Sequence, residues 1–259
     1  MIIDSHCHLH DPAFEDLRGA LARAAEHDVW GAVAVGCDQK TNARTLEAAA
    51  SNGKTVWPAL GFHPDWARLT DEDLERVEAQ VAAHHARVVA LGEVGLPWYC
   101  LEGATDAAGL MARGLRRFTR LLGLAVRYDL PLILHAPHGA AVGALEALKK
   151  RGIERAVFHW HKAPADVTRA IVAAGYLVSV TPEVVYRGRD RELVETVPLE
   201  SLLVESDGPW SYQGEFVGMP SGPWLCSRVA EEVAKIKGLP VDEVAYQISA
   251  NTCQIFNLT

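Results

Sequence analysis

Met1-Ile2-Ile3-Asp4-Ser5-His6-Cys7-His8 opens the chain with an apolar run followed by two histidines one residue apart. In a β-strand, residues two apart point to the same side, so His6 and His8 can face one metal ion while Cys7 points away. Acidic or imidazole side chains recur at the ends of later strand-like runs, as Glu93, His135, His159 and Asp207. Because the carboxyl ends of barrel strands share one rim, this recurrence predicts a metal site at the mouth of a β/α barrel.

Short β-rich runs alternate with helical patterns along the whole chain. The helical patterns carry apolar stripes at spacings of three and four residues, for example Leu115, Phe118 and Leu122. The expected strands cover residues 1–3, 31–35, 55–61, 88–94, 130–135, 153–159, 176–181 and 199–205. Buried strands alternating with amphipathic helices, in a chain of 259 residues, predict an α/β fold with a single (β/α)8 TIM barrel over residues 1–259.

Composition narrows the class of protein further. Hydrophobic residues make up 49% of the chain, but no apolar run approaches the about 20 residues that cross a bilayer. The first ten residues lack a basic group, which argues against a signal peptide. The five cysteines are scattered and odd in number, which favours reduced thiols over a disulfide framework. We therefore expect a cytoplasmic protein without a membrane partner.

The net charge of -8 argues against a general nucleic-acid-binding surface, since nonspecific affinity for phosphate backbones comes from many Lys and Arg contacts. It does not exclude a phosphate substrate, because divalent ions would add positive charge at the mouth of the barrel. The longest irregular segment, residues 208–223, is a candidate substrate lid or rim, since long loops in compact domains are usually functional.

The candidate ligands are more numerous than one ion with an open position needs. Imidazoles and carboxylates suit Zn²⁺, Mn²⁺ or Fe²⁺, with Mg²⁺ also possible, and six groups suggest two ions. Glu93, placed between the other ligands, is the natural bridge, and ions about 3.5 to 4 Å apart can hold a shared hydroxide as nucleophile. Any one histidine could instead bond to a loop, and Asp207 could begin a turn. A mouth crowded with unpaired acids and imidazoles is costly without a cation, which favours the metal interpretation.

Several segments together resemble the signatures of the TatD family, metal-dependent hydrolases of the amidohydrolase-like barrel superfamily best known as deoxyribonucleases. The segments are Asp4-Ser5-His6-Cys7-His8-Leu9, Gly61-Phe62-His63-Pro64, Gly92-Glu93-Val94-Gly95-Leu96, Leu130-Pro131-Leu132-Ile133-Leu134-His135, Glu205-Ser206-Asp207-Gly208-Pro209 and Asn251-Thr252. The resemblance implies one ion held by His6, His8, Glu93 and Asp207, and a second held by Glu93, His135 and His159. It also implies that His63 contacts a phosphate or leaving group.

The chain departs from the family pattern in loops that would grip a phosphate. Pro97 stands where the family commonly has Asp, and Pro137 stands where an Arg usually follows. The segment after His159 supplies His161 and Lys162, which we expect to bind substrate together with His63, with Lys162 replacing the missing positive charge. We expect His159 and His161 to face the same side of their strand, so spacing alone leaves open which of them binds metal. Register with the family favours His159.

Three functions fit these residues. The first is a phosphodiesterase or deoxyribonuclease, similar to a 3'-5' exonuclease, in which Glu93, His63 and Asp207 are catalytic and Asp207 takes or relays the proton of a metal-bound hydroxide. Its substrate would be a DNA end or a small phosphoester. The second is an amide, lactone or carboxylic-ester hydrolase, whose barrel relatives often carry a carbamylated lysine at the position of Glu93. The third is a binding protein that retains the metals. The presence of all six candidate ligands argues against it.

Overall fold

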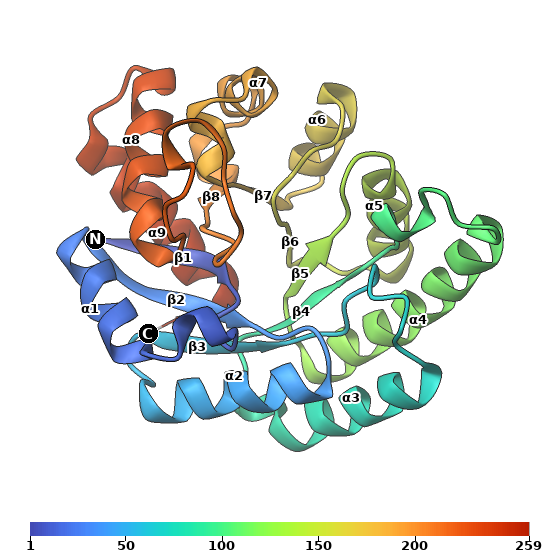
Figure 1. Ribbon diagram of the computed structural model, residues 1–259. Helices are drawn as coiled ribbons and strands as arrows, with labels where there is room; N and C mark the ends of the chain where they lie inside the picture. The colour runs from blue at the N-terminus through green and yellow to red at the C-terminus, as the bar shows by residue number, and fades with distance from the viewer. Residues whose placement is uncertain (259) are drawn as a thin grey trace.

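The computed structural model describes residues 1–258, in which eight parallel strands form one sheet and each strand pairs with the next along the chain. The helices lie outside the strands (Figure 1). The strands are β1 (Ile2–Cys7), β2 (Val29–Val35), β3 (Val56–Leu60), β4 (Ala90–Gly95), β5 (Leu132–His135), β6 (Ala156–Phe158), β7 (Leu177–Val180) and β8 (Leu202–Val204). The (β/α)8 barrel predicted from the alternation of strands and helices is confirmed.

A helix follows each strand, and one more helix ends the described chain. The α-helices are α1 (Leu17–Glu26), α2 (Gln39–Ser51), α3 (Asp71–His84), α4 (Ala107–Tyr128), α5 (Ala140–Arg151), α6 (Ala165–Ala173), α7 (Gly188–Thr196), α8 (Cys226–Lys237) and α9 (Val241–Phe256). Short 3-10 turns are η1 (Pro12–Phe14), η2 (His85–Arg87), η3 (Tyr99–Leu101), η4 (Pro182–Val185), η5 (Leu199–Ser201), η6 (Gly214–Phe216) and η7 (Pro223–Leu225). Among residues 1–258, no helix combines the length and apolar composition needed to cross a membrane.

Helix α3 begins with reciprocal capping that ends the long loop after β3. The Asp73 amide donates to Thr70 Oγ1 at 3.2 Å, and Asp73 Oδ2 accepts from the Thr70 amide at 2.9 Å. These bonds satisfy amides that the first turn of a helix leaves without partners. The loop between β3 and α3, which carries His63 and Asp65, is therefore held at both ends by regular structure.

Alternation along the strands separates an inner and an outer apolar layer. In β5, Leu132 and Leu134 pack outward in one cluster with Phe118 of α4. Ile133, between them, belongs to a second cluster that includes Phe256 of α9 and fills the barrel interior. The same alternation turns His135, two residues past Ile133, toward the barrel axis.

Strand β4 contains a bulge that changes the direction of its last residues. Leu91 pairs with Leu132 and Val94 pairs with Leu134, so β4 uses one residue more than β5 over the same length. Leu91 and Val94 both pack in the outer layer. Regular alternation from Leu91 would send Glu93 outward, and the extra residue turns it inward instead.

The barrel closes between β1 and β8 through contacts at the last residue of β8 and just beyond it. Ser5 Oγ donates to the Val204 carbonyl at 3.0 Å, the Asp207 amide to the His6 carbonyl at 3.0 Å, and the His8 amide to the Gly208 carbonyl at 2.8 Å. Strand β1 is longer than the predicted residues 1–3, because its polar residues find buried partners across this seam. The seam brings residue 207 beside the two histidines of β1.

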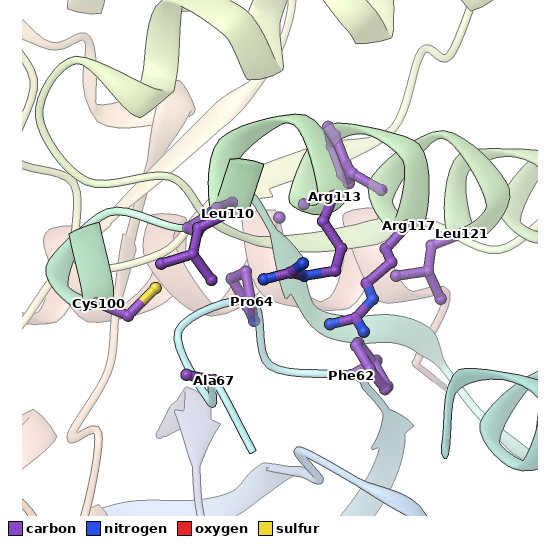
Figure 2. A pocket seen from close by; sticks show the side chains of 12 residues that line it. Phe62, Pro64, Ala67, Cys100, Leu110, Arg113, Arg117 and Leu121 are labelled. Carbon is purple, nitrogen blue, oxygen red and sulfur yellow. The ribbon is translucent and has the colours of Figure 1, made fainter. Parts of the chain in front are cut away.

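The arginine-rich face of α4 pairs with the neighbouring helix rather than with the barrel mouth. Arg117 Nε lies 2.6 Å from Asp71 Oδ1, and Arg120 Nη2 lies 2.6 Å from Glu78 Oε2, both residues of α3. Arg117 also lies with Pro64 at a cavity of about 20 Å³ between α4 and the loop after β3 (Figure 2). Exposed pairs of this kind contribute little stability, about 0 to 1 kcal/mol each.

Candidate metal centre

Glu93 lies at the centre of a group of histidines from different strands. Its Oε1 atom is 2.6 Å from His135 Nδ1 and 2.7 Å from His159 Nε2. Its Oε2 atom is 3.7 Å from the Nε2 atoms of both His6 and His8. The side chain of Glu93 is only 2% exposed, so these imidazoles are its surroundings in place of water. The two carboxylate oxygens therefore face two different pairs of histidines.

Asp207 completes the group on the side of β1. Its Oδ1 atom lies 3.4 Å from His6 Nε2 and 3.3 Å from His8 Nε2, and those two nitrogens are 3.4 Å apart. The backbone of Asp207 is left-handed, with φ of 43°, a conformation that side chains other than glycine seldom adopt. This turn, anchored by the seam between β1 and β8, aims the carboxylate into the mouth of the barrel.

The residues fit divalent cations. Asp207 Oδ1 is buried and has no hydrogen-bond partner among the described residues. Ligand atoms of His6, His8 and Glu93 lie within 4.8 Å of one another. An isolated buried carboxylate oxygen is costly, and a cation placed among these atoms would offset that cost. The mixture of imidazole nitrogen and carboxylate oxygen suits zinc, manganese or iron.

His63, from the loop after β3, comes as near to Glu93 as the expected ligands do. Its Nε2 atom is 3.3 Å from Glu93 Oε1, and His63, Glu93 and His135 form another group of atoms within 4.8 Å of one another. Its Nδ1 accepts the Asp65 amide at 3.2 Å, and its ring stacks on Trp66 with centroids 5.5 Å apart. The amide contact places the proton of a neutral ring on Nε2, which faces the site.

The pKa shifts of the site, taken without a cation, run in both directions. Burial raises the pKa of the Glu93 carboxyl, but the imidazoles of His63, His159 and His135 lower it more, and it ends well below its usual range. Burial and the neighbouring His159 hold the pKa of His6 well below its usual range. Burial likewise lowers the pKa of His63. Burial opposes the charged form of His159, but Glu93 outweighs burial and raises the pKa of this imidazole to about 10. Ionised carboxylate and neutral imidazole are the forms that bind a cation, so Glu93 and His6 are ready to bind one and His159 releases a proton when it does.

Two further carboxylates lie behind the histidines, and neither was found by sequence reasoning. Asp65 Oδ2 lies 2.7 Å from His135 Nε2, and Glu205 Oε1 lies 3.4 Å from His159 Nδ1. Burial opposes the charged form of His135, but its hydrogen bonds to Asp65 and Glu93 outweigh burial and raise its pKa. Their positions in the sequence could have indicated them. Asp65 lies two residues after His63, and Glu205 lies two residues before Asp207.

The group lies at the floor of a cavity of about 960 Å³. Aromatic and basic side chains line the cavity as well. The lining includes His8, His63, Glu93, His135, His159 and Asp207, the aromatic residues Trp66, Tyr99, Trp160 and Trp210, and the basic residues Arg44, Lys162 and Arg187. A cavity of this size is in the range of small-molecule sites.

The structure separates the two substrate residues predicted after β6. Lys162 lines the cavity, with Nζ 3.6 Å from the centroid of the Trp160 ring. His161 points away from it and is buried, with Nε2 2.9 Å from Thr168 Oγ1. Strand β6 already ends at Phe158, and Trp160 is left-handed with φ of 38°, so strand alternation does not continue to residue 161. The expectation that residues 159 and 161 share a side is therefore wrong.

The segment 208–223, predicted as a lid or rim, is anchored by aromatic residues. Tyr212 and Phe216 are buried in one cluster with Trp160 and Trp224. Trp210 is 55% exposed and meets Trp160 edge to face, with centroids 5.2 Å apart. One aromatic ring of this segment is thus presented at the cavity, while the others hold the segment in place.

Comparison with known proteins agrees with this architecture. Residues 3–257 match the family model described as TatD related DNase. The chain is 31% identical over 261 residues to the uncharacterized metal-dependent hydrolase YjjV of Escherichia coli, covering 99% of this chain and 98% of that protein. It is 29% identical over 263 residues to human "Deoxyribonuclease TATDN3", covering 98% and 94%.

Solved structures give the same assignment. The crystal structure of the Escherichia coli TatD homologue YjjV superposes with a TM-score of 0.89 at 30% sequence identity, covering 100% of this chain and 98% of the other. A TatD family hydrolase from Entamoeba histolytica, at 17% identity and a TM-score of 0.84, shares the fold. Since the family model spans nearly the whole chain and a relative above 30% identity covers it end to end, this chain belongs to the TatD-related DNase family.

Proposed function

We propose that this protein is a metal-dependent phosphodiesterase that removes nucleotides from DNA ends, in the manner of a 3'-5' exonuclease. The observation that carries the proposal is the position of Glu93, whose two oxygens face two pairs of histidines at the floor of a large cavity. The family match and the relative named as a deoxyribonuclease support the same class of reaction.

In this proposal two divalent ions share the site. His6, His8 and Asp207 would hold the first ion, His135 and His159 would hold the second, and the Glu93 carboxylate would be a ligand of both. Bound there, the cations would supply an activated water and positive charge for the phosphate oxygens. The nearest alternative, hydrolysis of an amide, lactone or carboxylic ester, uses the same ligands and is distinguished by the choice of substrate.

Asp207 and His63 handle protons and charge beside these ligands. Asp207 faces the cavity and carries a buried oxygen without a hydrogen-bond partner among residues 1–258, so it can accept a proton from the attacking water. His63 is neutral, carries its proton on Nε2 and lines the cavity, so it can donate to a phosphate or leaving-group oxygen.

The walls of the cavity favour a nucleotide end over a small polar ester. Tyr99 and Trp210 are exposed aromatic residues at the cavity, and aromatic rings stack on nucleic-acid bases without strong sequence preference. Lys162 lies beside the Tyr99 hydroxyl at 3.4 Å and supplies a positive charge for a phosphate. A net charge of -8 gives little long-range attraction to DNA, so activity should be weak and sensitive to salt.

The proposed function is tested by metal analysis combined with a substrate panel. We expect about two divalent ions per chain and activity with Mn²⁺, Mg²⁺, Zn²⁺ or Co²⁺ on end-labelled single-stranded DNA. Double-stranded DNA, RNA, chromogenic phosphodiesters, lactones and carboxylic esters complete the panel. Cleavage of a lactone, amide or carboxylic ester with no cleavage of any phosphodiester would replace the nuclease assignment by the alternative.

Glu93→Gln should be the most damaging single substitution in the site. It keeps the size of the side chain but removes the negative charge that both ions share, so metal content should fall at both positions. A loss of several kcal/mol of charge stabilisation corresponds to a decrease of about 10³-fold in kcat/KM. Elemental analysis and steady-state kinetics measure both effects, with the exposed Glu102→Gln as the control. Full turnover and full metal content in Glu93→Gln would show that two ions are not required.

His63→Ala should separate catalysis from metal binding. Metal stoichiometry should stay at the wild-type value, while kcat falls by about 10²-fold because one proton donor is lost. The exposed His27→Ala is the matched control. If elemental analysis of His63→Ala shows one ion fewer, His63 is a ligand, as its distance from Glu93 also allows.

Lys162→Ala should weaken substrate binding more than the rate. We expect KM for single-stranded DNA to rise about tenfold with kcat nearly unchanged. The slope of log KM against log salt concentration should decrease by about the contribution of one phosphate contact. Lys150→Ala, at the exposed end of α5, controls for the loss of a surface charge. An unchanged KM together with an unchanged salt dependence would remove Lys162 from the substrate site.

A further inference from the structure

Asp65 connects three separate segments at the edge of the metal centre. Its Oδ2 atom lies 2.7 Å from His135 Nε2, at the end of β5. Its Oδ1 atom accepts the amides of Trp98 at 2.7 Å and Cys100 at 3.0 Å, in the loop after β4. Its own amide donates to His63 Nδ1 at 3.2 Å. One residue thus contacts two site histidines and anchors a neighbouring loop.

The opposite nitrogen of His135 faces the proposed ions. Nδ1 lies 2.6 Å from Glu93 Oε1, the same oxygen that His159 Nε2 approaches at 2.7 Å. An imidazole nitrogen must be free of its proton to bind a cation, and the other nitrogen then carries the proton. A carboxylate can only accept, so without a cation the ring donates to Glu93 and to Asp65 alike. When a cation takes the place of the proton between Nδ1 and Glu93, Asp65 retains the proton on Nε2.

We propose that Asp65 is a positioning residue that holds His135 with its proton on Nε2 and its free Nδ1 aimed at the ion shared with Glu93 and His159. This inference rests on the metal-dependent function proposed above. Asp65 lines the edge of the same cavity, and it acts through the orientation and tautomer of the histidine ring. Partners of this kind usually change metal affinity by about 10- to 100-fold when they are lost.

The surroundings give Asp65 little freedom to move. On the other side of the loop, Pro64 and Cys100 line the cavity of about 20 Å³ together with Leu110 of α4 (Figure 2). Such a space is close to the volume of a single water-sized probe, so the two loops are packed against the helix almost without a gap. The side chain of Asp65 is only 9% exposed. The Asp65 carboxylate is therefore held in a fixed position opposite the His135 ring.

A purely structural role predicts a different outcome from a positioning role. If Asp65 only anchors the loop after β4, Oδ1 is sufficient, because both loop amides donate to that oxygen. Asp65→Asn keeps this acceptor and places an NH₂ group opposite His135 Nε2. That group can only donate, so it favours the tautomer in which Nδ1 carries the proton and cannot bind metal. Asp65→Ala removes both functions.

The test is calorimetric titration of metal-free protein with Zn²⁺ and with Mn²⁺. In Asp65→Asn we expect one of the two sites to weaken by about 10- to 100-fold and the other to change by less than about threefold, with a wild-type melting temperature. The matched control is Asp106→Asn, an exposed Asp that accepts the Gly109 amide at 2.9 Å and has no contact with the site. Control and wild type should titrate alike.

A second measurement does not depend on a variant. Long-range ¹H–¹⁵N spectra of the wild-type protein loaded with Zn²⁺ should show His135 with a hydrogen-bonded proton on Nε2 and a metal-bound shift at Nδ1. A metal-bound Nε2 would overturn the inference. So would wild-type affinity at both sites in Asp65→Asn, or equal weakening of both. Wild-type protein that binds no divalent ion would instead refute the proposed function itself.

Discussion

The structure depends on one electrostatic constraint, the burial of the Glu93 carboxylate among imidazoles. A buried ionised carboxylate costs several kcal/mol unless positive charge or hydrogen-bond donors compensate it. Here the compensation comes from histidines on β1, β5 and β6 and from the loop after β3, which converge on its two oxygens. This arrangement needs residues from distant parts of the chain, and a closed barrel rim is a geometry that supplies them.

Two irregularities in the barrel direct Glu93 and Asp207 toward these histidines. The bulge in β4 turns Glu93 inward although the neighbouring Leu91 and Val94 both pack outward. The seam between β1 and β8 places the left-handed Asp207 beside His6. Both departures from regular strand geometry occur at the carboxyl ends of strands, where barrel enzymes keep their reactive groups. The regular part of the barrel is a packed apolar core that holds the rim rigid.

Several arginines outside the metal centre are held in ion pairs within the protein. Arg189 contacts both Glu183 and Asp190, each at less than 3 Å, and Arg191 pairs with Glu232. Lys162 instead lies on the Trp160 ring at the rim of the cavity. A polyanionic substrate would therefore be bound chiefly by local contacts at the mouth and by the cations there, and only weakly by the field of the whole molecule.

The sequence by itself determined the barrel and the candidate ligand set, because strand and helix periodicity and the identity of side chains at strand ends are local properties. These local properties predicted the (β/α)8 fold and marked residues such as Glu93 as candidate ligands. Only the tertiary structure decided which side chains meet. It turned His161 out of the cavity, because β6 ends early, and it brought Asp65 behind His135, 70 residues further along the chain. Bulges, strand ends and pairings between distant loops depend on register and packing across the whole barrel, which no local pattern records.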